Sequence, residues 1–292
     1  MHMKHTRVSS TLIIFITSSL LARIEEDDVP QIGNLTLGAS QQPAPLFGFG
    51  FGQNIIDRHD TLIYLYPSFI HGCTITRHEV TPTFLYGIRD DLSLLIQLPV
   101  AYKLRYGNRC SSEAEDLLIQ GEYACYVNDI TYNQITVMTN ITIPTGSRKK
   151  TPTTGCGSTS FLLGGTISHS GPEWYLWAVG GAIFSVTRKH TKIGNQFPYN
   201  IGIGKNIAYR PKQWVLALLL ECDGIFQQCD KRNGLRDINS GGNTIFIGPS
   251  LWFSTAHLTL QAGIAWAVTQ RLNGTQNKEQ CICACNVGWK FN

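Results

Sequence analysis

From residue 59 onward, apolar side chains alternate with small or polar ones along most of the chain. In residues 92–106 every even position is apolar or aromatic, and the odd positions include Ser93, Gln97, Lys103 and Arg105. A period of two residues is typical of a β-strand with one apolar face. The pattern predicts about twelve strands, at residues 60–71, 77–88, 92–105, 116–128, 131–144, 158–169, 173–186, 197–210, 213–226, 244–254, 257–268 and 280–291.

The length of these strands distinguishes two all-β architectures. Strands of a β-sandwich usually have about 5 or 6 residues, whereas a tilted strand needs about 9 to 11 residues to cross a membrane. Aromatic residues lie near the ends of the apolar faces, as expected at the two membrane interfaces; examples are Tyr102, Tyr106, Trp214, Phe226, Trp289 and Phe291. We therefore predict an all-β fold, a closed antiparallel transmembrane β-barrel of about 12 strands, in the outer membrane of a Gram-negative cell.

The connections between the predicted strands alternate in length, which supports the barrel. With a periplasmic amino terminus, the even-numbered connections are periplasmic turns, and they are short, at Arg89–Asp91, Asn128–Ile130, Ser170–Pro172, Pro211–Lys212 and Thr255–Ala256. Apart from the first, the odd-numbered connections are long and polar, at residues 106–115, 145–157, 187–196, 227–243 and 269–279. Such alternation is typical of outer-membrane barrels, whose long loops face the outside.

Composition excludes several other classes. Charged residues make up 15% of the chain, compared with about 25% in a typical soluble domain. Mean hydropathy is −0.05, and the chain contains no run of 18 apolar residues, so we predict no membrane helix. The net charge of +4 is not gathered into a basic cluster of the kind that nucleic acids require, so we expect no nucleic-acid partner.

The amino-terminal region divides into two parts. Lys4 and Arg7 precede a short apolar run that ends at Ala22, which is the layout of a secretory signal peptide over residues 1–22; a buried helix is the alternative. Residues 23–58 contain the run PLFGFGFG and are expected to form a periplasmic tail or a plug inside the lumen. The barrel itself is expected to span residues 59–292.

The chain has nine cysteines, so at least one is unpaired. Cys281, Cys283 and Cys285 alternate along one predicted strand, and we favour a membrane-facing structural role for them over metal binding. A further four cysteines are expected near the outer rim, where they could pair: Cys73, Cys110, Cys156 and Cys229. No metal or cofactor motif is present in the sequence, and we expect neither.

Charged and amide side chains on the polar parity of the strands are the candidate functional residues. A charge facing lipid costs about 2–4 kcal/mol at the membrane midplane, so these residues should point into the lumen. They either conduct solutes or form a salt-bridged network that holds the barrel's shape. The predicted pore-lining residues are Lys103, Arg105, Glu122, Glu221, Asp223, Lys290, Gln97, Gln134 and Asn140. Lys205 lies on the apolar parity, which indicates a bulge or a side chain that reaches the interface.

Several short motifs in a shared order resemble a known family. They are Gln97-Leu98-Pro99-Val100, Ile143-Pro144-Thr145-Gly146, Phe161-Leu162-Leu163-Gly164, Gly241-Gly242 before Gly248-Pro249, and Leu272-Asn273-Gly274. Together they resemble the outer-membrane family described as "putative MetA-pathway of phenol degradation". The resemblance covers most of residues 60–292 and implies a transporter-like barrel; the family's name is not evidence for phenol chemistry here. The chain departs from outer-membrane barrels in ending Lys290-Phe291-Asn292, with the aromatic residue one position early.

We therefore expect a channel or transporter-like barrel that passes small solutes, hydrophobic or aromatic ones among them, with outer-membrane lipid and the barrel assembly machinery as its other partners. The alternatives are a phospholipase-type outer-membrane hydrolase and a structural or adhesive barrel with a blocked lumen. For a hydrolase, the nearest candidate cluster is Ser168-His169-Ser170, at a predicted periplasmic turn. The sequence has no GxSxG motif, so we expect no enzymatic activity.

Overall fold

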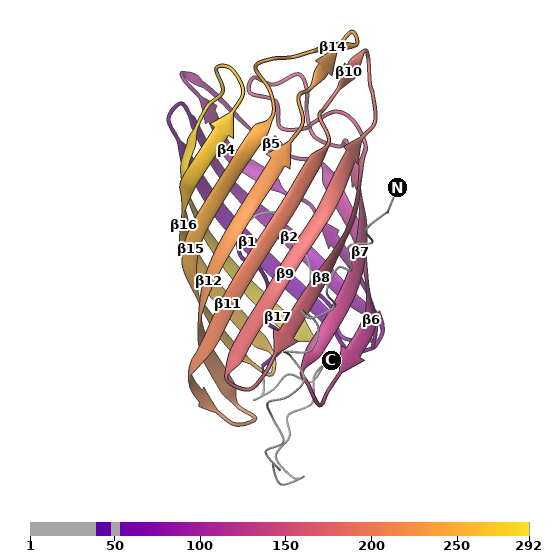
Figure 1. Cartoon of the computed structure of the whole chain (residues 1–292), viewed down its shortest axis with the longest axis vertical. Coiled ribbons are helices and arrows are strands. Elements are labelled where there is room, and N and C mark those ends of the chain that lie inside the picture. The colour runs from indigo at the N-terminus through magenta and orange to yellow at the C-terminus, as the bar shows by residue number, and fades with distance from the viewer. Residues whose placement is uncertain (1–38, 48–52, 292) are drawn as a thin grey trace, which may run out of the picture.

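The chain folds into a closed antiparallel β-barrel with a twelve-strand wall (Figure 1). The computed structural model describes residues 39–47 and 53–291, so the predicted signal peptide lies outside the described residues. Strand β1 (Thr61–Gly72) pairs with both β2 (Ile75–Arg89) and β17 (Glu279–Phe291), and these two pairings close the sheet. No described residue belongs to a helix long and apolar enough to cross a membrane. The predicted fold class is confirmed.

The other wall strands follow one another around the barrel. Two of the twelve wall strands are interrupted, so that each is made of two shorter strands: β3 continues into β4, and β5 continues into β6. Strand β2 accordingly pairs with both β3 and β4. The first break falls at Pro99, which has no N–H to donate to the sheet. The bounds are β3 (Leu92–Gln97), β4 (Val100–Tyr106), β5 (Arg109–Ala114), β6 (Leu117–Asn128), β7 (Asn133–Ile143), β8 (Ser160–Ser170), β9 (Trp174–Ser185), β11 (Gln196–Arg210), β12 (Trp214–Gln227), β15 (Gly242–Thr255) and β16 (Leu258–Leu272).

The two faces of the wall differ as the alternation predicts. Ile167 and Ile201 are 63% and 61% exposed, whereas their chain neighbours Thr166 and Asn200 are 2% and 3% exposed. In a soluble protein a belt of exposed apolar side chains this extensive would be unfavourable. The outer face is therefore the lipid-contacting surface of an outer-membrane barrel. The inner face carries the buried polar side chains together with a buried apolar cluster that includes Trp177, Leu219 and Trp252.

Short turns and long loops lie at opposite ends of the barrel. The short connections agree with the predicted periplasmic turns, and the loops of residues 144–159, 186–195, 228–241 and 273–278 lie at the outer end. Three strands of two residues each in these loops form a separate small sheet above the wall, at the top of Figure 1: β10 (Thr191–Lys192), β13 (Lys231–Arg232) and β14 (Leu235–Arg236).

One predicted loop is wrong. Residues 106–115 contain the second half of a hairpin, in which β5 pairs with β4. The two strands are joined by a two-residue turn, in which Gly107 has a φ of 57°. The hairpin extends the wall beyond β3 and β6. Its strand sequence, RCSSEA in β5, is polar, because a strand outside the bilayer needs no apolar face. The alternation on which the prediction relied is therefore missing from this segment.

Lys205 and the three cysteines of β17 lie on the outer face of the wall as expected. The Lys205 side chain is exposed, and its Nζ is 4.8 Å from the centre of the Trp174 ring; a bulge follows between Asn206 and Ala208. In β17 Ile282 and Ala284 are buried inside, so Cys281, Cys283 and Cys285 face outward. All nine cysteines are described and none forms a disulfide.

Candidate functional site

The lumen is lined by polar side chains from most of the wall. Glu122 of β6 and Glu221 of β12 are each only 1% exposed and point inward. Gln134 and Asn140 of β7 are buried on the same face, and Asn140 donates to Gln120 through its Nδ2 at 3.1 Å. This arrangement places four of the predicted residues inside the barrel and away from lipid.

The three other inward residues lie nearer the ends of their strands. Asp223 accepts a hydrogen bond from Asn200 Nδ2 at 3.4 Å, and Gln97 donates to Thr83 Oγ1 at 3.2 Å. Lys290 pairs with Leu62, which is fully buried, so it shares the inner face. The inward orientation of these residues follows directly from their parity.

Two predicted residues point the other way. Lys103 and Arg105 are exposed, and their cross-strand partners are His78 and Thr76 on the outward parity of β2. The pairing shifts by one residue next to Ala101, which leaves Leu104 on the inner side. A bulge reverses the face of every residue that follows it, so the expectation that Lys103 and Arg105 line the lumen is wrong.

The chain before β1 runs inside the barrel. We call residues 39–47 and 53–58 the inner segment; nearly all of them are buried, although they form no strand with the wall. The backbone N–H groups of Leu46 and Phe47 donate to Glu221 Oε2, at 2.8 and 3.4 Å. Ser250 donates to the other oxygen of the same carboxylate at 3.0 Å. Glu221 therefore accepts hydrogen bonds from backbone N–H groups that have no partner in the sheet.

Glu122 binds the second part of the inner segment in the same way. Asn54 donates to this carboxylate from its backbone N–H at 2.9 Å and from its Nδ2 at 2.6 Å. Gln120 Nε2 adds a third hydrogen bond at 2.6 Å. Hydrogen bonds to a charged acceptor are stronger than those between neutral groups. Two inward carboxylates, from the separate wall strands β6 and β12, thus hold the two parts of the inner segment.

Hydroxyl and amide groups hold the first residues of the inner segment. Ser40 Oγ lies 3.1 Å from Ser254 Oγ and also contacts Thr259 Oγ1. Gln42 bonds to Gln134 at 3.4 Å and accepts a hydrogen bond from Ser170 at 3.1 Å. One of the predicted lumen residues, Gln134, therefore contacts the chain itself.

Apolar contacts complete the fit of the inner segment. Leu46 and Phe47 pack in a buried cluster with Phe246, Ala265 and Ile282 of three wall strands. Ile56 packs in another cluster, with Leu62, Tyr64, Leu85 and Leu95. The inner segment is thus matched to the lumen by packing as well as by hydrogen bonds.

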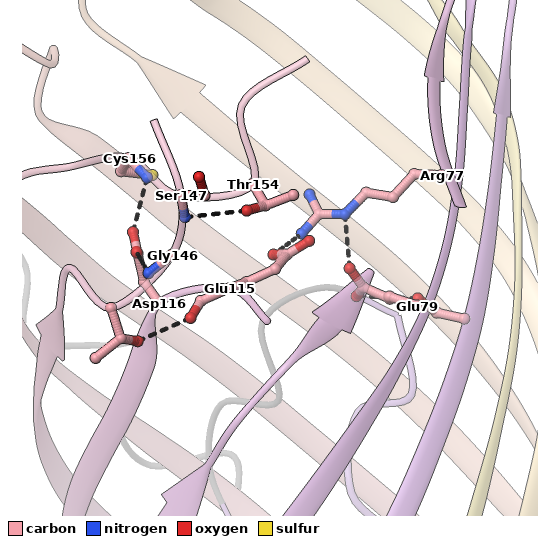
Figure 2. A network of polar contacts seen from close by, with 10 residues as sticks. Arg77, Glu79, Glu115, Asp116, Gly146, Ser147, Thr154 and Cys156 are labelled. Carbon is pink, nitrogen blue, oxygen red and sulfur yellow. Dashed lines mark hydrogen bonds and ion pairs between the residues drawn. The ribbon is translucent and has the colours of Figure 1, made fainter. Parts of the chain in front are cut away.

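A second polar cluster lies at the outer mouth, where β7 ends and its loop begins (Figure 2). The Arg77 Nε is 2.6 Å from Glu79, and its Nη2 contacts Glu115. Asp116 accepts hydrogen bonds from the backbone of Gly146 at 2.9 Å and of Cys156 at 2.7 Å. Both ends of the 144–159 loop are therefore fixed to the residues that join β5 and β6.

The acidic groups at this mouth outnumber the bases. Burial raises the pKa of Glu115 to about 7; Arg77 lowers it, and Glu79 and Asp116 raise it. Burial and, to a smaller extent, the two neighbouring carboxylates outweigh the single guanidinium, so the Glu115 carboxyl group binds its proton near neutral pH. Burial likewise raises the pKa of the Cys156 thiol to about 11, so this thiol is protonated at neutral pH.

Lys290 forms the centre of an ion-pair cluster at the periplasmic end. Lys290 Nζ is 2.6 Å from Asp60 and 3.8 Å from Asp57, and its side chain is only 11% exposed. This pairing ties the last wall strand to the chain that leads from the inner segment into β1. Of the predicted lumen residues, Lys290 is the one with ion-pair partners among the described residues.

Sequence reasoning missed the residues of the outer mouth. Arg77 and Glu79 come from the first residues of β2, and Glu115 and Asp116 come from the break between β5 and β6, where apolar alternation is weak. Arg77 and Glu79 share one parity with Thr81 and Thr83, so the polar face of β2 held a signal. The pairing of Arg77 with Glu115 depends on the β4–β5 hairpin, which the hydrophobic pattern did not predict.

The serine and histidine cluster considered for hydrolysis is separated by the wall. Ser168 and Ser170 are buried on the inner face, and Ser170 bonds to Gln42. His169, between them, lies on the opposite parity, where its Nδ1 is 3.0 Å from Asn133 Oδ1. Successive strand residues point to opposite faces, so this histidine does not face either serine as a base.

The sequence model of a protein family described as "Putative MetA-pathway of phenol degradation" matches residues 40–276. The chain belongs to this family. The resemblance to this family is confirmed, and the match extends from Ser40 in the inner segment through β16, leaving out only the last wall strand. No curated protein sequence matches the chain.

Solved structures similar to this family member are outer-membrane barrels. An outer membrane channel from Pseudomonas putida F1 has a TM-score of 0.70 at 15% identity, over 84% of this chain and 100% of that one. The NanC porin has a TM-score of 0.50 at 11% identity, over 79% and 99%. The beta domain of the Bordetella autotransporter BrkA also reaches 0.50, at 10% identity over 80% and 100%. These likenesses support the fold.

Proposed function

We propose that the protein is an outer-membrane channel for small solutes, hydrophobic or aromatic ones among them, in which the inner segment acts as a plug. The observation that carries this proposal is the way in which Glu122 and Glu221 hold the inner segment. These carboxylates bind chain that contributes no strand to the wall. The inner segment can therefore move without breaking a wall pairing.

Movement of the inner segment would leave a passage lined by polar groups and by apolar side chains such as Phe246 and Ile282. The groups that bind it are carboxylates, amides and hydroxyls, which water can solvate in its place. The wall would stay intact because its strands pair only with one another. Solutes would then diffuse along the inner face, past Gln134 and Asn140 toward the outer mouth.

Current through a planar bilayer tests this function. We expect small or rare conductance steps from the full chain, and larger and more frequent steps from the double variant Glu122→Ala/Glu221→Ala. Glu173→Ala is the matched control, because Glu173 is an exposed acid of a periplasmic turn. Electrically silent full-chain and double-variant proteins, both shown to be folded by heat-shifted gel mobility, would contradict the channel and favour a barrel with a permanently blocked lumen.

A further inference from the structure

The outer loops carry a strong excess of positive charge. The loops of residues 144–159 and 186–195 contain no acidic residue, and their bases are Arg148, Lys149, Lys150, Arg188, Lys189 and Lys192. The periplasmic turns have the opposite composition, with Asp90, Asp91, Asp129 and Glu173 against Lys212. The cationic character therefore belongs to one end of the barrel.

Three of the outer bases form a row across the small sheet. Lys192 of β10 pairs with Lys231 of β13, which pairs with Arg236 of β14. Residues directly opposite one another in antiparallel strands project to the same face, and like charges in such positions are destabilising. We call these three residues the basic row. An anion bound over the row would remove the repulsion that the pairing creates.

The acidic residues near the basic row are engaged elsewhere. Asp237 pairs with Arg232 at 3.2 Å, on the other face of β13. Asp230 accepts hydrogen bonds from the backbone of Gly194 at 2.9 Å and from Gln227 at 3.2 Å. In the described part of the chain, no salt bridge neutralises any member of the basic row.

The outer loops also form a hollow of about 620 Å³. It is lined by Arg148, Lys149, Arg188 and Lys189, with Glu113 as its single acidic residue. The 186–195 loop joins the two features, because it supplies Arg188 and Lys189 to the hollow and Lys192 to the row. Arg188 is held in place by its hydrogen bond to the Gly157 carbonyl at 2.6 Å.

We infer that the basic row and the hollow bind the phosphate groups of the glycolipid in the outer leaflet. Guanidinium and ammonium groups are the usual protein ligands of phosphate. The inner face of the barrel argues against a free anion on its way through the lumen. That anion would next meet Glu79, Glu115 and Asp116 at the mouth, and then Glu122 and Glu221. An anion that stays at the outer surface meets none of these carboxylates.

Hydrogen exchange of the outer loops tests this binding. The full chain is placed in phosphatidylcholine nanodiscs alone, with 10% rough lipopolysaccharide, or with the same lipopolysaccharide after removal of its phosphates. We expect amides of residues 186–195 and 228–241 to exchange at least five-fold more slowly with the phosphorylated lipid only. The triple variant Lys192→Gln/Lys231→Gln/Arg236→Gln should lose this protection.

The control variant removes three exposed bases at the periplasmic end, Arg58→Gln/Arg210→Gln/Lys212→Gln, and should keep the protection. Protection that survives in the triple variant, or that fails to depend on lipid phosphate, would overturn the inference. Equal protection by inorganic pyrophosphate in nanodiscs without lipopolysaccharide would assign the site to a free anion. The measurement does not involve current, so its outcome is independent of the channel proposal.

Discussion

The carboxylate of Glu221 accepts the backbone N–H of Leu46 at 2.8 Å, across 175 positions of sequence. Glu221 lies in the middle of a wall strand, and Leu46 belongs to chain that precedes the whole barrel. A buried carboxylate without partners would be strongly unfavourable, and so would buried N–H groups without acceptors. The carboxylate and the N–H groups can therefore be buried because each supplies the hydrogen-bond partner of the other.

Glu221→Ala should release the first part of the inner segment and leave the second part bound. The change removes the acceptor of two backbone N–H groups, at a cost of about 1–3 kcal/mol for each group left unsatisfied. We expect amide exchange of residues 39–47 to rise at least ten-fold, with little change at residues 53–58. Glu122→Ala is the reciprocal variant and should show the opposite pattern, because its partner is Asn54. Equal effects of both variants on both parts would show that the inner segment is not held at two separate points.

Gly87→Ala should disturb the entry of the chain into β1. A Cβ atom at Gly87 would lie 2.0 Å from the Asp57 carbonyl oxygen, so the backbone of the inner segment must move. We expect a loss of about 1–3 kcal/mol in the free energy of unfolding, measured by urea titration in lipid vesicles. Gly121→Ala is a matched control on β6, beyond β3 in the same sheet, where an added Cβ meets nothing within 4 Å. A smaller loss for Gly87→Ala than for Gly121→Ala would contradict the close packing of this segment.

Arg77→Gln should destabilise the barrel far more than Arg89→Gln. Arg77 is the base that faces the carboxylates of Glu79 and Glu115, whose side chains are only 14% and 10% exposed. Removing one partner of a buried ion pair costs about 3–5 kcal/mol. Arg89 and Asp91 are 58% and 40% exposed, and such a pair contributes about 0–1 kcal/mol. Urea unfolding of both variants at pH 8 measures the difference, and similar losses would be inconsistent with a buried network.

The outer mouth should become less stable as pH rises from about 4.5 to about 7. Glu115 has a higher pKa in the folded protein than in the unfolded chain, so the folded state holds its proton more tightly in this window. The stabilising contribution is complete below the unfolded pKa and is lost as pH passes the folded pKa of about 7. Thermal midpoints at pH 5 and pH 8, compared between the full chain and Glu115→Gln, measure this contribution. The variant should show the smaller pH difference, and an unchanged difference would assign the effect to other groups.

Strand parity made most of the wall predictable. A residue's face follows from its position along a strand, so Glu122, Glu221, Gln134 and Asn140 could be placed inside from the sequence alone. The same rule failed at Lys103 and Arg105, because one extra residue in a bulge reverses all that follows. The apolar alternation of residues 92–106 continues unbroken past this bulge, so the sequence pattern did not signal it.

The partners of the lumen residues could not be predicted. The sequence placed Glu122 and Glu221 in the lumen, but the groups that bind them come from a segment without periodicity. Asn54 and Leu46 are brought there by the closure of the barrel, which is a property of the whole sheet. The mouth cluster of Arg77, Glu79 and Glu115 depends in the same way on which strands become neighbours.

The place of the inner segment restricts the order in which the molecule can assemble. Residues 39–58 emerge before any wall strand, yet their anchors Glu122 and Glu221 belong to β6 and β12. The seam between β1 and β17 can form only when the final strand arrives. The inner segment is therefore synthesised before the wall strands that bind it. Until those strands are in place, the apolar side chains of Leu46 and Phe47 remain exposed to water and to other chains.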